Sequence, residues 1–131
     1  MNPSKTVIII NDDESILTLF HIYLSLRRPD LKLVLCRNSE EANSALKKRQ
    51  ALDLLITDLE RESKNSGQVF ISAFRKLFKT TPILVVSGTD MSEQAVAAIP
   101  SNGFVRMPFD GETLLVAVDQ LLKPSIRRPA K

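Results

Sequence analysis

The chain contains no tryptophan, and only one cysteine and one histidine occur among its 131 residues. Because Cys36 is alone, no internal disulfide can form, and a single cysteine inside an apolar segment is usually a small buried side chain. His21 alone excludes a metal site built from several histidines and argues against a Ser-His-Asp triad. Disulfide scaffolds and histidine-based metalloenzymes are therefore set aside.

Long hydrophobic runs are also missing. No apolar run approaches the roughly 20 residues that a membrane-spanning helix needs. The first residues, Met1 to Lys5, lack the basic region and long apolar core of a signal peptide. The phosphate-binding glycine motifs of nucleotide enzymes, G-x-x-x-x-G-K-[ST] and G-x-G-x-x-G, are absent as well. We expect a cytoplasmic protein that does not contact a membrane.

The remaining composition is that of an ordinary globular domain. Hydrophobic residues make up 44% of the chain, charged residues 25%, and the formal net charge is +3. This length and composition predict one domain with a substantial core, which we place at residues 1–123. The basic tail at 124–131 is expected to be a solvated end, and direct nucleic-acid binding is not expected from so mild a charge.

Apolar runs and helical patterns alternate five times along the chain. Short runs rich in Val, Ile and Leu predict buried strands at 7–10, 31–36, 54–56, 83–86 and 104–107. Helical periodicity follows each of them, at about 15–28, from 39, from 68, at 90–99 and from 110. This alternation predicts an α/β fold, a doubly wound five-stranded parallel sheet with helices on both faces.

The first predicted helix has an unusually wide apolar stripe. Leu19, Ile22 and Leu26 extend the stripe beyond the residues that recur at ordinary helical spacing. We expect a broadly covered helix, with an exposed surface for a partner as the alternative.

The segment Asp53 to Asp58 is the element around which the rest is organised. Its apolar part is too short for a helix and has no polar alternation, so it predicts a central strand buried on both faces. Asp58 follows that strand directly. In open α/β sheets, ligands bind in the crevice beyond the carboxyl ends of the strands. Asp58 is therefore a candidate functional residue.

Other strands deliver side-chain oxygens to the same predicted edge, namely Asp12 and Asp13 after the first strand and Ser87 at the fourth. Two unit charges about 4 Å apart repel by roughly 4 kcal/mol at an effective dielectric constant of about 20. Three carboxylates would therefore protonate, hold a cation or need a basic neighbour. Oxygen ligands alone favour a hard ion, Mg²⁺ above all. A carboxylate beside Mg²⁺ can attack phosphorus, with Ser87 bonding the phosphoryl oxygens.

Each of these features also has an ordinary structural explanation. An acidic pair after a strand often forms only a turn and a helix cap. A Ser-Gly pair after a strand is commonly just a loop. The combination, in this order and at these distances, is what indicates a site.

These residues resemble a known family, the receiver domains of two-component response regulators, and are similar to the stand-alone chemotaxis type. The resemblance covers about Thr6 to Leu122 and implies a flavodoxin-like sheet of receiver topology. Its motifs are Val7 to Asp13 with the acidic pair, Asp58, Ser87-Gly88 and Pro108-Phe109.

The resemblance implies a role for each matching residue. Asp58 would be the phosphoacceptor, Ser87 the switch hydroxyl and Phe104 the switch aromatic. Mg²⁺ would be held by Asp12, Asp13, Asp58 and the main-chain carbonyl of Glu60. The family also suggests a cis peptide bond between Met107 and Pro108. The partners implied are a sensor histidine kinase or phosphotransfer protein and an unidentified downstream protein. Such a domain is not an enzyme beyond self-phosphorylation and self-dephosphorylation, and we expect a monomer or weak homodimer.

The chief departure from the family is Met107, because receivers normally carry a lysine before that proline. Arg106 should not substitute, since adjacent strand residues point to opposite faces. Arg61 or Lys64, in the loop after Asp58, could reach in instead. That loop also lacks the family's usual Met-Pro, and its Gly67 falls one residue late. We expect Mg²⁺ binding to persist and the coupling of phosphorylation to conformational change to be weaker.

Two alternatives remain. The first is a degenerate receiver that binds partners independently of phosphorylation, for which Met107 is the main argument. The second is a phosphatase of the haloacid-dehalogenase type, suggested by Asp58-Leu59-Glu60. That family needs a second Asp two residues on, and its nucleophile follows the first strand of its sheet, whereas Asp58 follows the third.

Overall fold

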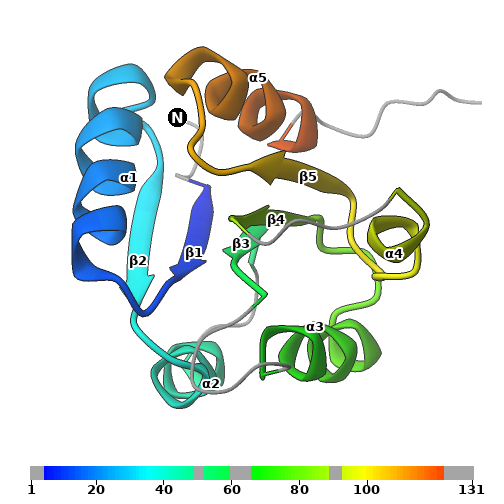
Figure 1. Ribbon diagram of the computed structural model, residues 1–131. Helices are drawn as coiled ribbons and strands as arrows, with labels where there is room; N and C mark the ends of the chain where they lie inside the picture. Colours follow the sequence, from blue (N-terminus) through cyan, green and yellow to red (C-terminus); the bar gives the residue numbers. More distant parts are fainter. Residues whose placement is uncertain (1–4, 49–51, 60–65, 89–92, 123–131) are drawn as a thin grey trace, which may run out of the picture.

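The computed structural model describes residues 5–48, 52–59, 66–88 and 93–122. Strands and helices alternate throughout these ranges (Figure 1). In chain order the elements are β1 (Thr6–Ile10), α1 (Glu14–Arg27), β2 (Lys32–Cys36), α2 (Ser39–Lys47), β3 (Leu54–Thr57), α3 (Ser66–Leu77), β4 (Ile83–Ser87), α4 (Glu93–Ala97), β5 (Gly103–Arg106) and α5 (Gly111–Leu122). The predicted alternation is confirmed.

The five strands form one parallel sheet in the order β2-β1-β3-β4-β5. All of β3 and all of β4 are buried, as their unbroken apolar runs predict for central strands. Helices α1 and α5 cover one face, and α2, α3 and α4 lie on the other side (Figure 1). The predicted doubly wound, flavodoxin-like fold is therefore confirmed.

Side chains alternate between two hydrophobic cores along each strand. The core beneath α1 and α5 receives from the sheet Val7, Ile9, Leu54, Ile56, Leu84, Val86 and Val105. The core beneath α2 and α3 receives from the sheet Ile8, Ile10, Cys36, Leu55, Ile83 and Val85. Burying an aliphatic side chain of this size contributes roughly 1.5–3 kcal/mol. Cys36 is buried as expected, and desolvation raises the pKa of its thiol to about 11, so it is an inert apolar side chain.

Helix α1 is fastened to α5 and to the loop before it. The Phe20 and Phe109 rings stack with their centroids 5.3 Å apart. Tyr23 donates its hydroxyl to a carboxylate oxygen of Glu112 over 2.9 Å, and Arg27 pairs with the same carboxylate. These contacts tie the segment after β5 and the beginning of α5 to α1 on the face of the sheet that α1 and α5 cover.

The apolar stripe on α1 is not broadly covered, which corrects that expectation. Leu19, Ile22 and Leu26 are 49%, 52% and 75% exposed. They lie on the side of the helix opposite the buried Leu17, Phe20 and Leu24. In a doubly wound fold only one layer of helices covers each face, and nothing described in this chain lies over the outer side of α1.

Further expectations concern helix α4, the C-terminal tail and membrane-spanning segments. Helix α4 ends at Ala97, two residues before its predicted end at Ile99. Asp90, its predicted cap, and the tail at 124–131 lie outside the described ranges. Within the described ranges, no helix combines the length and apolar character needed to cross a bilayer.

Candidate functional site

The carboxyl ends of the central strands bring the candidate residues to one edge of the sheet. The last register pair between β1 and β3 is Ile10 with Thr57, so Asn11 and Asp58 leave the two strands at the same level. Ser87 is the last residue of β4, the strand on the other side of β3. The predicted convergence of the first, third and fourth strand ends is therefore present in the backbone.

Asp58 is largely withdrawn from solvent, with 8% of its surface exposed. Its main-chain carbonyl accepts a hydrogen bond from the Thr57 hydroxyl over 3.0 Å. Asp58 lies beyond a central strand, at the edge where ligands bind in such sheets. Its position, rather than its burial alone, makes it the candidate functional residue.

The residue level with Asp58 on the neighbouring strand is Asn11, and its side chain is also buried, at 7% exposure. Its main-chain N–H donates to the carbonyl of Cys36 over 3.0 Å, which continues the pairing of β1 with β2. Its side-chain Oδ1 accepts a hydrogen bond from the N–H of Asp13 over 2.9 Å. We did not select Asn11 from the sequence, although a polar residue directly after a four-residue β-branched run was a usable signal.

Asp13 has a structural role in addition to the one expected of it. It is the N-cap of α1, and its Oδ1 accepts hydrogen bonds from the N–H groups of Ser15 (2.9 Å) and Ile16 (3.4 Å). The first turn of a helix has unpaired N–H groups that attract such a carboxylate. Within the described ranges, which include Asp12, Asp13 and Asp58, no group of three or more acidic, histidine or cysteine side chains could hold a metal ion. The metal-binding roles expected of Asp12, Asp13 and Asp58 stay predictions.

Ser87 and Phe104 occupy the next two strands. Ser87 is buried at the end of β4. Phe104 of β5 pairs with Val85 of β4, and its ring is half-buried against the core beneath α2 and α3. The Arg106 guanidinium lies over the Phe104 ring, 6.0 Å from its centroid. Arg106 thus lies on the side of the sheet opposite the α1 and α5 core, as predicted from strand alternation.

Met107 packs against the other face, with the core beneath α1 and α5. Its N–H donates to the carbonyl of Ser87 over 2.9 Å, which fixes it at the same edge of the sheet. The peptide bond between Met107 and Pro108 is cis, as the resemblance suggests. The position expected to carry a lysine is therefore held by a partly buried apolar side chain that packs against the core.

The loop after Asp58 is only partly described. Glu60, Arg61 and Lys64 lie outside the described residues, so the expected carbonyl ligand and the two proposed cations stay predictions. Gly67, in the first turn of α3, donates its N–H to the carbonyl of Leu59 over 2.9 Å. A Cβ atom at Gly67 would lie 2.4–2.5 Å from backbone atoms of Asp58 and Leu59. The backbone that carries Asp58 is thus in direct contact with α3.

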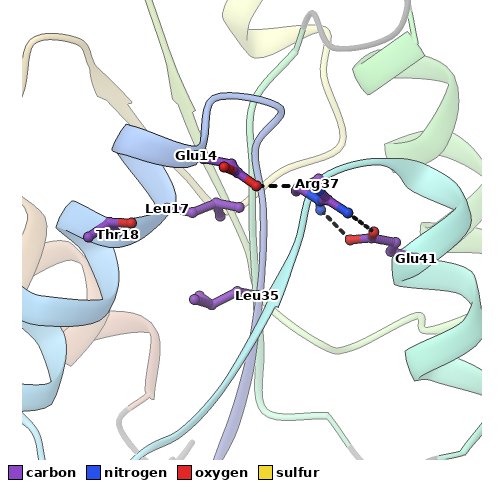
Figure 2. Close-up of a pocket in the computed structure, with 6 residues that line it drawn as sticks. All are labelled: Glu14, Leu17, Thr18, Leu35, Arg37 and Glu41. Atoms are coloured by element: carbon purple, nitrogen blue, oxygen red, sulfur yellow. Dashed lines mark hydrogen bonds and ion pairs between the residues drawn. The ribbon is translucent and has the colours of Figure 1, made fainter.

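A pocket of about 430 Å³ opens beside the site, between the beginning of α1 and the end of β2 (Figure 2). At its rim Arg37 pairs with Glu14 (3.1 Å) and Glu41 (3.2 Å). The bond from the Arg37 backbone N–H, together with its guanidinium, lowers the pKa of the Glu41 carboxyl. Figure 2 shows the Arg37 guanidinium held between the two carboxylates. Because this cation is committed to those carboxylates, it does not supply the charge that Met107 lacks.

Comparisons with known proteins agree with this geometry. No curated protein matches the chain. Among solved structures, the receiver domain of an HD domain-containing protein from Pseudomonas fluorescens Pf-5 is similar, with a TM-score of 0.81 at 21% identity over 93% of this chain and 89% of that one. The chemotaxis response regulator CheY4 of Vibrio cholerae has a TM-score of 0.77 at 24% identity over 91% and 99%. The receiver domain of NtrX from Brucella abortus has a TM-score of 0.79 at 22% identity over 91% and 99%.

These structures share the fold of this chain at low identity. The family model of the response regulator receiver domain matches residues 7–119, most of the chain. Together with the strand order and the strand-end residues Asp58 and Ser87, this match establishes that the chain belongs to the response regulator receiver domain family.

Proposed function

We propose that the chain is a phosphorylatable receiver of a two-component phosphorelay in which Asp58 accepts the phosphoryl group. Receiver domains are signalling modules that interact with histidine kinases or phosphotransfer proteins. The observation that carries the proposal is the buried carboxyl group of Asp58 at the carboxyl end of the central strand β3, beside the end of β4 with Ser87. A carboxylate placed there is protected from bulk water yet open to a donor approaching that edge.

The proposed transfer is a simple displacement at phosphorus. A carboxylate oxygen of Asp58 forms a bond to phosphorus, and the phosphorus–nitrogen bond to the donor's histidine breaks. The electron pair leaves with the imidazole nitrogen, which takes a proton from solvent. Ser87 then donates its hydroxyl to a phosphoryl oxygen, and Phe104 turns inward. This movement biases a protein-interaction surface for a downstream partner.

The residues present fit Mg²⁺, although they offer fewer carboxylates than expected. Mg²⁺ in such sites is held by one or two carboxylates, with water and phosphate oxygens completing its shell. We assign those carboxylates to Asp58 and to Asp12, which is exposed at the same edge. When bound, Mg²⁺ neutralises charge on the phosphoryl oxygens. We leave Asp13 out of this set because its Oδ1 already accepts the N–H groups at the beginning of α1.

The proposal is tested by intact-protein mass spectrometry after incubation with acetyl phosphate, with and without Mg²⁺. We expect a mass increase of one phosphoryl group that depends on Mg²⁺. An unmodified chain at saturating donor and metal would overturn the proposal. The cytoplasmic location and the monomeric or weakly dimeric state belong to the same proposal.

The assignment of metal ligands predicts a difference between two adjacent acids. Replacing Asp12 with Asn should abolish the thermal stabilisation by Mg²⁺, whereas replacing Asp13 with Asn should leave it intact because asparagine caps helices as well as aspartate does. A ligand at about a hundredfold excess over its Kd stabilises by roughly 2.7 kcal/mol, which raises the Tm by about 5–10 °C. Differential scanning fluorimetry measures the effect. Loss of the Mg²⁺ shift in the Asp13 variant alone would return Asp13 to the metal site.

The exposed stripe of α1 lies on the helix that begins at the site, which makes it the proposed docking surface for the phosphodonor protein. Replacing Ile22 with Glu should slow transfer from a histidine kinase that phosphorylates the wild-type chain by about ten-fold, because a charge replaces an apolar contact. Labelling by acetyl phosphate should not change. Leu77, 80% exposed at the end of α3, is the matched control, and its replacement by Glu should affect neither donor. Equal slowing by both variants would rule out α1 as the docking surface.

A second candidate function is a binding module that works without phosphorylation. The observation that favours it is the packing of Met107 into the core, where the family's lysine would otherwise contact the phosphoryl group. This alternative predicts a downstream partner that binds the unmodified chain and an Asp58→Asn variant equally well.

A further inference from the structure

Asn11 has a buried amide nitrogen that makes no hydrogen bond within the described ranges. Only 7% of the surface of Asn11 is exposed. Its hydrogen bonds use only the main-chain N–H and the side-chain oxygen. Buried polar groups in native proteins are nearly always paired, so each unpaired one calls for an explanation. A donor that awaits an incoming acceptor is such an explanation.

The orientation of this amide is fixed by its partner. Oδ1 accepts from the Asp13 N–H over 2.9 Å, and the amide nitrogen, itself only a donor, could not take that place. The oxygen is therefore turned toward the beginning of α1. Nδ2, at the other end of the same amide, carries two hydrogens that the bond to Asp13 leaves unused.

Register and strand alternation indicate where Nδ2 lies. Asn11 and Asp58 follow the paired residues Ile10 and Thr57, so they are neighbours across two parallel strands. Ile9 and Ile56, two positions earlier, both belong to the core beneath α1 and α5. Side chains two residues apart share a face, which places Asn11 and Asp58 on that same face. Met107 packs on this face too, and its thioether supplies no donor.

We propose that Asn11 donates a hydrogen bond from Nδ2 to a phosphoryl oxygen carried by Asp58, at the edge of the sheet where Met107 takes the place of a lysine. Asn11 is neutral, so it transfers no proton and changes no bond of the transfer step. It stabilises the phosphorylated state by pairing with an oxygen that would otherwise rely on metal and Ser87. This inference rests on the proposed phosphorylation of Asp58.

The competing explanation is that Asn11 only orients α1 through Asp13. The two explanations separate at one substitution. Asn11→Asp keeps an oxygen that can accept from the Asp13 N–H, and it removes the donor. Asn11→Ala removes both. A purely structural role is therefore preserved by Asp and lost with Ala, whereas a donor role is lost in both variants. Because Asp also adds a negative charge beside Asp58, weaker binding by that variant supports the donor role only together with a shift of the wild-type Asn11 amide signals.

The test uses beryllofluoride, a mimic of the phosphoryl group, at Mg²⁺ concentrations that saturate each variant. Fluorine NMR reports whether the mimic is bound. The side-chain amide signals of Asn11, assigned by their absence from the spectrum of Asn11→Asp, report its hydrogen bonding. We expect one amide proton to move downfield on binding, and we expect both variants to bind beryllofluoride about three- to ten-fold more weakly, the effect of one hydrogen bond.

The outcomes distinguish the two proposals. Bound fluorine signals with unmoved Asn11 amide signals and an unchanged affinity in Asn11→Asp would overturn the role of Asn11 and leave the receiver function standing. No bound fluorine signal in the wild-type chain would overturn the receiver function itself, and this inference with it. If Asn11→Ala does not fold, the amide shift in the wild-type chain and the affinity of Asn11→Asp still decide the question.

Discussion

Replacing Asp58 with Asn is expected to abolish covalent labelling by acetyl phosphate while leaving the fold intact. The amide has nearly the shape of the carboxylate but no nucleophilic oxygen of comparable strength. Because the amide fills the same buried volume, we expect the variant to remain folded. Intact-protein mass spectrometry and thermal unfolding measure the two effects on the same samples.

Met107→Lys is the variant to compare with Asp58→Asn in the same experiment. A lysine there places an ammonium group at the edge that carries Asp58 and Ser87, since the position is hydrogen bonded to Ser87 through the backbone. A hydrogen bond to a charged group contributes roughly 1.5–3 kcal/mol, so we expect the phosphorylated state to gain about ten-fold or more in stability. Undiminished labelling of Asp58→Asn would show that another side chain is the acceptor. Labelling of Met107→Lys alone would identify the wild-type chain as the phosphorylation-independent module.

Much of the fold follows from residue patterns. An uninterrupted apolar run such as Ile83 to Val86 is buried on both sides only where helices cover both faces of the sheet. The structure buries β3 and β4 completely. Asp58 was predictable for the same reason, since a carboxylate directly after a central strand must lie at the sheet edge. The alternation of faces correctly predicted that Arg106 lies away from the α1 and α5 core.

The details of the first strand end were not predictable. Asn11, Asp12 and Asp13 are consecutive and polar, and any two of them could have formed the pair beside Asp58. The choice depends on where β1 ends relative to β3 and on which residue caps α1, and both are tertiary facts. The structure pairs Ile10 with Thr57 and commits Asp13 to the helix, so the buried residue beside Asp58 is an amide. The exposure of Leu19 and Leu26 could not be predicted either, because hydrophobic periodicity does not show which face of a helix lacks a neighbour.

This arrangement changes the argument about the missing lysine. With three carboxylates, a basic residue would be needed to relieve a repulsion of roughly 4 kcal/mol per close pair. With Asn11 beside Asp58 and Asp13 turned to α1, that repulsion is smaller from the start. An apolar Met107 is therefore less costly to an unphosphorylated site than the sequence suggested. A lysine would also donate a hydrogen bond to the phosphoryl group, and Met107 cannot do so.

Replacing Gly67 with Ala is expected to destabilise the protein and displace Asp58. The new Cβ would lie 2.4 Å from the Cα and carbonyl oxygen of Leu59 and 2.5 Å from the carbonyl oxygen of Asp58. All three are backbone atoms, so relief requires the first turn of α3 to move away from the strand end. In a helix, alanine is otherwise favoured over glycine by about 1 kcal/mol. Overpacking of this kind costs typically 1–3 kcal/mol, and more where backbone must move.

We expect the steric term to exceed the helix-propensity term, giving a net loss of about 2 kcal/mol or more and a Tm lower by roughly 5–10 °C. Gly88→Ala is the matched control, because its Cβ would lie 3.7 Å from the Met107 Cβ, an ordinary contact at the same edge of the sheet. Thermal unfolding and acetyl phosphate labelling of both variants separate the effects. A Gly67 variant as stable and as readily labelled as that of Gly88 would mean that α3 can withdraw from the segment that carries Asp58 without cost, and the close contact would then have no part in positioning Asp58.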